Sequence, residues 1–204
     1  MNSQTTQTII LTEDEKDVLQ ELMNVAYGSA ASVVAQMLDA FASLSIPKIE
    51  IMLTSELLEE FKKLKDSSYF FSTQAFIGEF SGESAFFIDD ASAKNLAKHL
   101  GLETQDDIDD AILELTNVLT SSLTTRLSKE MGTEVSFALP SITKLGLSDI
   151  SQSDTFIQYS RVIVIETAIN FEDQMISGEI FILTKDGSIQ WLKKRLSEIV
   201  ETLM

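Results

Sequence analysis

Two sets of polar residues in this sequence recur at identical spacing. Each set is an aspartate, a glutamate four positions later, an asparagine three positions after that, and a proline 23 positions further on. The first set is Asp17, Glu21, Asn24 and Pro47, and the second is Asp110, Glu114, Asn117 and Pro140. At about 100° per residue, the aspartate, glutamate and asparagine of each set would share one narrow face of a helix.

A carboxylate beside a carboxamide is better suited to positioning other groups in a reaction than to transferring protons. An amide cannot act as a general base, and a glutamate on an open helix face has no evident partner to shift its pKa. A carboxamide can instead hold a water molecule in line with a phosphorus atom, as a glutamine does in GTPases. A carboxylate can bind a lysine or a metal-bound group supplied by another protein. The chain has no cysteine and a single histidine, His99, which excludes thiol nucleophiles, thiolate metal sites and histidine clusters.

Two long helices are expected to carry these residues. Residues 12 to about 39 have apolar residues at helical spacing behind a capping-box pattern of Thr12 and Glu15, and a second helix should open near Thr104 with an acidic first turn. The core-facing residues are predicted on the opposite side: Leu19, Leu22, Ala26, Val33 and Met37 in the first helix, and Ile112, Leu115 and Leu119 in the second. The polar sets should therefore face solvent, and the small residues Gly28 and Ser121 should keep the same face open one turn further on.

The repeated spacing indicates an internal duplication. An exposed helix face tolerates many residue types, so two otherwise divergent segments have no reason of helix stability to keep the same aspartate, glutamate and asparagine. Later in the chain, SGESAFFID at 81–89 corresponds to SGEIFILT at 177–184. The chain is therefore predicted to be a single domain, 1–204, made of two repeats at about 12–101 and 104–203.

The segments between and after the helices predict an antiparallel sheet. KIEIML at 48–53 alternates as a strand, 55–65 is typical of a short helix, 143–154 is loop-like, and hairpins are expected over 69–89 and 159–184. Each repeat should close with a helix, at about 91–100 and 188–203. The predicted class is α+β, with helices packed on a largely antiparallel six-stranded sheet of approximate two-fold symmetry. Pro47 and Pro140, at strand entrances, are interpreted as shaping the chain.

The charge of the chain limits its partners. There are 32 acidic and 15 basic residues, and the formal net charge of −17 disfavours nucleic acid, whose binders neutralise phosphates with lysine and arginine. The N-terminus lacks the features of a secretory signal, and no apolar run approaches 18 residues, so we expect a cytoplasmic protein without membrane insertion.

The two motifs resemble the signature of the CheC, CheX and FliY family of response-regulator phosphatases. Two complete copies in one chain are most similar to CheC. The resemblance implies that the substrate is the phosphoaspartate of the receiver CheY. Glu21 and Glu114 would bind the receiver's active-site lysine, and Asn24 and Asn117 would position the water. Asp17, Asp110, Pro47, Pro140, Gly28 and Ser121 would support the two sites.

The resemblance also bears on cofactors and partners. The chain would need no metal or cofactor of its own, because the Mg²⁺ belongs to the receiver, and CheD is a possible second partner. Many relatives have a glycine-rich stretch after the first asparagine, whereas this chain has Tyr27 there, which we expect on the flank of the first site.

Two other functions fit the same sequence. The chain could be a non-catalytic binding module, similar to CheC or to the middle domain of FliM, that captures a receiver or CheD. It could also be an unrelated acidic enzyme acting on small molecules, although it lacks a glycine-rich phosphate loop and a metal-binding cluster. Complete glutamate and asparagine pairs in both copies favour the phosphatase.

Overall fold

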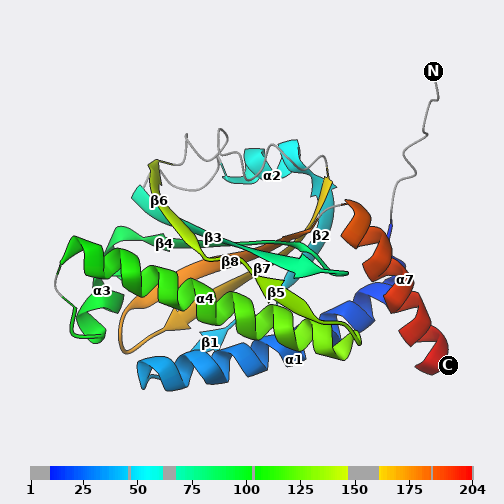
Figure 1. Ribbon diagram of the computed structural model, residues 1–204, viewed down its shortest axis with the longest axis horizontal. Helices are drawn as coiled ribbons and strands as arrows, with labels where there is room; N and C mark the ends of the chain where they lie inside the picture. The colour runs from blue at the N-terminus through cyan, green and yellow to red at the C-terminus, as the bar shows by residue number, and fades with distance from the viewer. Residues whose placement is uncertain are drawn as a thin grey trace.

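The computed structural model describes residues 10–45, 47–61, 68–102, 104–146, 161–184 and 186–203. Within them, five helices pack on one antiparallel sheet of eight strands (Figure 1). In chain order the elements are α1 (Glu13–Leu38), β1 (Ser43–Leu44), β2 (Lys48–Leu53), α2 (Thr54–Phe61), β3 (Ser68–Gly78), β4 (Gly82–Asp89), α3 (Asp90–His99), α4 (Gln105–Glu130), β5 (Val135–Phe137), β6 (Ser141–Gly146), β7 (Arg161–Phe171), β8 (Ile176–Thr184) and α7 (Asp186–Leu203). The strand order is β1-β7-β8-β4-β3-β5, with β2 also paired to β7 and β6 also paired to β3.

The helices divide unequally between the two faces of the sheet. The long helices α1 and α4 run antiparallel across one face, joined there by α3 and α7, whereas α2 lies over the other face (Figure 1). The larger core lies between the sheet and the four helices of the first face. A smaller apolar cluster under α2 includes Phe71, Phe87 and Phe181. The ring centroid of Phe87 lies 4.9 Å from that of Phe71 and 5.4 Å from that of Phe181. The motif helices are thus held on the main core.

Most of the predicted elements are confirmed. The Thr12 hydroxyl accepts from the Glu15 backbone N–H at 3.2 Å, and the Glu15 carboxylate accepts from the Thr12 N–H at 2.8 Å, which completes the predicted capping box. Thr104 and Asp107 form a second capping box at the start of α4. The short helix predicted at 55–65 is α2, which ends at Phe61, and residues 62–65 lie outside the described residues. In the part of the chain that the structure describes, no helix is long and apolar enough to cross a membrane.

The sheet has eight strands rather than the predicted six because each outer strand is split. β1 and β2 both pair with β7 on either side of Pro47, and β5 and β6 both pair with β3 on either side of Pro140. Proline has no N–H to donate to a strand ladder, so the pairing is interrupted beside it. The loop predicted at 143–154 is wrong for its first residues, since β6 extends to Gly146; residues 147–154 lie outside the described residues.

The two split edges have matching registers. Lys48 pairs with Glu166 at one edge, and Ser141 pairs with Thr73 at the other. Ser141 is 93 positions after Lys48 in the sequence, and Thr73 is 93 positions before Glu166. The intervening bonds match as well: the Ser45 N–H donates to the Ala168 carbonyl at 2.9 Å, and the Ala138 N–H donates to the Ala75 carbonyl at 3.0 Å.

The predicted core face is confirmed in α4 and partly wrong in α1. Ile112, Leu115 and Leu119 are fully buried, as are Leu19 and Ala26, and Leu22 and Met37 are partly buried. Val33 is exposed, because α1 packs against α4 as well as the sheet, and this turns its buried arc toward Met23, Tyr27, Ala30 and Val34.

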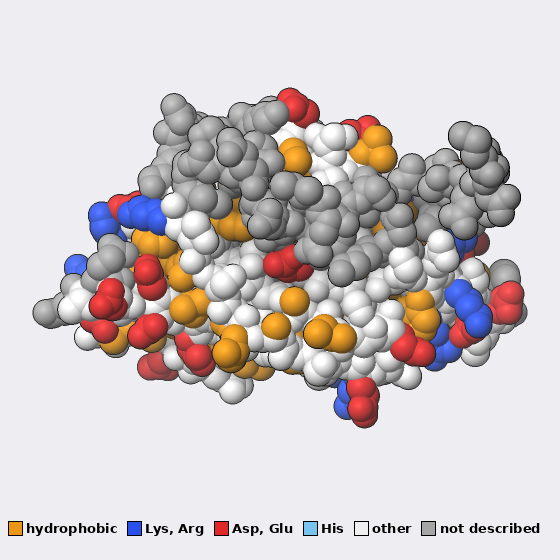
Figure 2. All heavy atoms as spheres, turned by 45° about the horizontal axis from the view of Figure 1, so that its top comes forward, with side chains coloured by type: hydrophobic (Ala, Val, Ile, Leu, Met, Phe, Trp, Pro, Cys, Tyr) orange, Lys and Arg blue, Asp and Glu red, His pale blue; other side chains and the backbone are white. Residues whose placement is uncertain are grey.

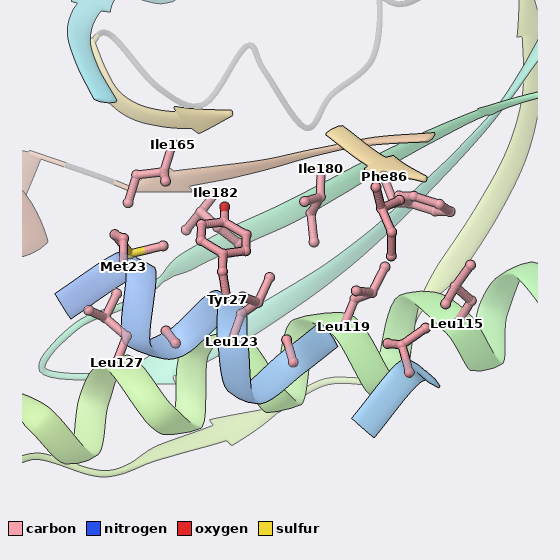
Figure 3. Close-up of a cluster of buried hydrophobic side chains, with 14 of the residues drawn as sticks. Met23, Tyr27, Phe86, Leu115, Leu119, Leu123, Leu127, Ile165, Ile180 and Ile182 are labelled. Carbon is pink, nitrogen blue, oxygen red and sulfur yellow. The ribbon is translucent and has the colours of Figure 1, made fainter. Parts of the chain in front are cut away.

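Tyr27 lies in the core rather than on the flank of the first site. Its ring extends from α1 toward the sheet, near Leu123 and Ile182 (Figure 3), and only 3% of the residue is exposed. Burial raises the pKa of its hydroxyl, which has no hydrogen-bond partner among the described residues.

One buried carboxylate links the two ends of the chain. Glu15 in α1 accepts a 2.6 Å hydrogen bond from the Ser197 hydroxyl of α7, and the Lys193 ammonium lies 3.8 Å away. Burial alone would raise the pKa of Glu15, but the hydrogen bonds from Ser197 and Thr12 and the nearby lysine together lower it below its ordinary value of 4.5.

We predict that Glu15→Gln lowers the free energy of unfolding at pH 7 by about 1–2 kcal/mol, because it removes a charged, buried acceptor. A lowered pKa in the folded state stabilises the protein above the pKa of the unfolded state and loses that effect as the pH falls through the folded value. Urea unfolding at pH 7, 5 and 3.5 should therefore show the variant approaching the wild type at acid pH. Glu13→Gln, in an exposed ion pair with Lys16, is the control and should cost under about 0.5 kcal/mol. A constant difference at all pH values would contradict the prediction.

Candidate functional site

Both motif faces are turned away from the core. Asp17, Glu21, Asn24 and Gly28 are exposed on α1, Asp110 and Glu114 are exposed on α4, and Asn117 and Ser121 are half-buried. Because α1 and α4 run in opposite directions, the two sets lie toward opposite ends of the helix pair (Figure 1). Each helix begins with its motif, so the polar face occupies its first half.

The set on α4 borders a hollow of about 350 Å³. Its lining residues come from α4 and from the segment between β5 and β6: Asp110, Leu113, Glu114, Asn117, Leu139 and Pro140. All four members of the second motif therefore meet in one place, although Pro140 lies 23 positions beyond Asn117. The proline-split edge brings its segment beside the helix.

Sequence reasoning missed the two leucines of this hollow. Leu113 is half-buried, and Leu139 is 92% exposed. The position of Leu139 immediately before the motif proline was a signal that could have identified it. A single exposed apolar side chain is ordinary on a protein surface, so what distinguishes Leu139 is its place in the lining of the hollow.

The carboxylates of the motifs are unpaired. Neither Glu21 nor Glu114 has a hydrogen bond or an ion pair with any of the described residues, and both are exposed. In Figure 2, several acidic side chains lie at the left of the face, where α3 and the start of α4 lie, with basic side chains near them, and further acidic groups lie at its centre, top and right. The glutamates are thus available to a cation that arrives from outside.

The two asparagines differ in their surroundings. The Oδ1 atom of Asn117 accepts a 2.8 Å hydrogen bond from Nε2 of Gln74, a residue of β3 that is 2% exposed. The same Nε2 donates to the Ala138 carbonyl at 2.9 Å. Asn24 instead accepts a 3.3 Å bond from the half-buried Gln20 of its own helix. The amide of Asn117 is therefore tied to the sheet, and that of Asn24 is not.

Sequence reasoning also missed Gln74. It faces α4 at the two-residue period shared with Phe70, Ser72 and Phe76, in a strand whose other large inward side chains are apolar. An amide at that position of a predicted strand was a weak signal of a specific contact.

Among the described residues, no three histidine, aspartate or glutamate side chains are placed to bind a metal ion together.

Comparison with known families gives a match over part of the chain. The profile of a family described as "Chemotaxis phosphatase CheX" matches residues 70–160, which is somewhat less than half of the chain and contains the whole second motif. A search of curated protein sequences gives no match. The sequence similarity therefore covers the α4 site and the strands around it.

Solved structures share the fold at low identity. FliY from Thermotoga maritima has a TM-score of 0.74 at 17% identity, over 93% of this chain and 99% of that one. CheX from Desulfovibrio desulfuricans has a TM-score of 0.56 at 16% identity, over 81% and 99%. The FliM middle domain from H. pylori has a TM-score of 0.59 at 16% identity, over 91% and 99%. The fold is that of CheX, FliY and FliM middle domains.

Gly28 lies on the first motif face, and packing within the protein does not explain why a glycine is there. A Cβ added at Gly28 would meet no atom within 4 Å, so nothing inside the protein requires a glycine there. Glycine in a helix interior costs about 1 kcal/mol relative to alanine.

We predict that Gly28→Ala raises the free energy of unfolding by about 1 kcal/mol and the Tm by about 2–4 °C. Thermal and urea unfolding would measure both quantities. Gly101→Ala is the matched control: its added Cβ would also meet nothing within 4 Å, but its φ of +74° makes alanine strained, so this variant should be destabilised. Destabilisation by Gly28→Ala would show that the open face is an internal requirement of the fold.

Proposed function

We propose that this protein is a chemotaxis phosphatase that hydrolyses the phosphoaspartate of a CheY-type receiver. The observation that carries the proposal is the hollow beside α4, which gathers Asp110, Glu114, Asn117 and Pro140 within the segment that matches the CheX family profile. A hollow of this kind can accept the active-site loops of a partner, and its polar groups can act on a bond that the partner supplies.

The glutamates and asparagines of the motifs have roles that fit their surroundings. The unpaired carboxylates of Glu21 and Glu114 would bind the receiver's active-site lysine, and the amides of Asn24 and Asn117 would orient a water molecule for attack on phosphorus. An acyl phosphate is already a reactive group, so positioning the nucleophile supplies the missing part of the catalysis. The receiver would contribute the Mg²⁺, and no covalent intermediate would form on this chain.

We also infer that the chain is one domain made of two repeats, each with a site. The support is the pair of split edges whose registers are related by 93 residues, the same spacing that separates the two motifs. If β1 with β2 and β5 with β6 are each counted as one interrupted strand, the sheet has six positions, three on either side of the β8–β4 pairing. The two repeats exchange edges, since each outer strand pairs with the hairpin of the other repeat.

A non-catalytic binding module is the second candidate. The likeness to FliM middle domains favours it, because the same fold supports a protein of the flagellar switch. In that case the hollow and Leu139 would capture a receiver, or CheD, without accelerating hydrolysis. The presence of both asparagines favours catalysis, since binding alone gives no reason to keep an amide at each site.

We predict that adding this protein to phosphorylated CheY with Mg²⁺ accelerates the loss of phosphate. The double variant Asn24→Ala with Asn117→Ala should lose on the order of 100-fold of that acceleration, because the positioned water is lost at both sites. Its fold should be retained: alanine is the better helix former at both positions, which offsets part of the loss of the hydrogen bond that Asn117 accepts from Gln74. Phosphate release at saturating receiver concentration measures the effect.

The matched control is Asn95→Ala, which removes an asparagine from α3 whose amide donates to the Met175 carbonyl, away from both motifs. It should leave the rate of phosphate release unchanged. A double variant as fast as the wild type would reject the catalytic assignment, and retained binding of the receiver would then favour the binding module.

The glutamates should act mainly on binding. Glu21→Gln with Glu114→Gln removes two unpaired carboxylates while keeping their shape, so we expect KM to rise by about tenfold and kcat to change less. Glu172→Gln with Glu201→Gln removes the same charge from exposed positions outside the motifs and is the control for long-range electrostatics. Equal effects of the two pairs on KM would argue against a specific contact with lysine.

A further inference from the structure

We propose that Gln74 is a positioning residue that fixes the amide of Asn117 and makes the α4 site the more effective of the two. The inference rests on the proposed function and adds to it a residue outside the motif. It also predicts which atom of the Asn117 amide, Oδ1 or Nδ2, meets the substrate.

Hydrogen bonds among the Ala138 carbonyl, the Gln74 amide and the Asn117 amide determine the orientation of the Asn117 side chain. The carbonyl of Ala138 belongs to the backbone and can only accept, so the end of Gln74 that lies 2.9 Å from it must be the NH₂ group. The second hydrogen of that NH₂ group is then directed at Asn117, 2.8 Å away, and the atom that it meets must be the acceptor Oδ1. The donor end of Asn117, Nδ2, is left without a partner among the described residues and belongs to a side chain that lines the hollow.

The burial of Gln74 makes this arrangement persistent. At 2% exposure, water has little access to compete for its hydrogen bonds. Its own Oε1 is buried without a partner in the part of the chain that the structure describes, which is unfavourable for folding. A buried amide that leaves one of its own atoms unsatisfied is poorly explained by packing, and its hydrogen bond to a motif residue supplies a reason for it.

The site on α1 lacks this support. Gln20, the partner of Asn24, is itself on the helix surface, and the bond of 3.3 Å is long. The residue 93 positions after Gln74 in the sequence is a threonine, which has no amide to repeat the arrangement. Asn24 must therefore be ordered when a receiver docks, whereas Asn117 is ordered beforehand and presents an N–H donor toward a phosphoryl or water oxygen.

The experiment uses single-site proteins. In the Asn24→Ala background only the α4 site operates, and adding Gln74→Met, which keeps the side-chain length but removes both donors, should lower kcat by about 3- to 10-fold, the usual cost of ordering one side chain at an interface. KM should stay within about twofold, because Gln74 is buried away from the partner. In the Asn117→Ala background, where only the α1 site operates, the same substitution should change neither value.

A second measurement needs no substitution at Gln74. In the ¹⁵N-labelled wild-type protein, the side-chain amide of Asn117 should be more ordered on the picosecond-to-nanosecond timescale than that of Asn24. Equal order of the two amides would overturn the inference even if Gln74→Met did not fold.

The kinetic outcomes separate this inference from the proposed function. An unchanged kcat after Gln74→Met in the Asn24→Ala background, or an equal fall in both backgrounds, would overturn the positioning role while the phosphatase assignment stood. Full activity of the Asn24→Ala, Asn117→Ala protein would overturn the phosphatase assignment, and the ordering of the Asn117 amide would then decide whether Gln74 fixes it.

Discussion

The antiparallel packing of α1 and α4 on one face of the sheet is the constraint on which the rest of the structure depends. Each helix has 26 residues and must bury one side in the shared core, so its opposite side has to face solvent. The motif residues occupy that outer side at the start of each helix. Their exposure is therefore a consequence of how the core is built, and rigid helices rather than loops hold the carboxylates and amides in place.

The sheet edges complete the site on α4. Because Pro140 interrupts the outer strand, the chain leaves β5, passes Leu139, and returns to pairing in β6 beside the helix. Gln74 ties the two parts together, since its amide binds both Asn117 of the helix and Ala138 of the split edge.

Local patterns were sufficient to predict much of this architecture. Thr12 and Glu15 are three positions apart and form the capping box that their spacing predicts, and the shared angle of Asp110 and Glu114 follows from helix geometry alone. Contacts between distant segments were beyond the same reasoning. Gln74 reaches Asn117 across 43 positions of sequence, and the burial of Tyr27 depends on α1 packing on two neighbours at once. A helical wheel drawn for one helix contains neither relationship.

The interrupted outer strands also matter for how copies of this chain behave at high concentration. A long, unbroken outer strand offers a row of unpaired N–H and C=O groups onto which another molecule can add by hydrogen bonding, and this is a common route to fibrous aggregates. Here each border of the sheet is divided into short ladders, β1 and β2 on one side and β5 and β6 on the other, with a proline at each break. The same residue that opens a hollow beside α4 thereby leaves a poor template for self-association.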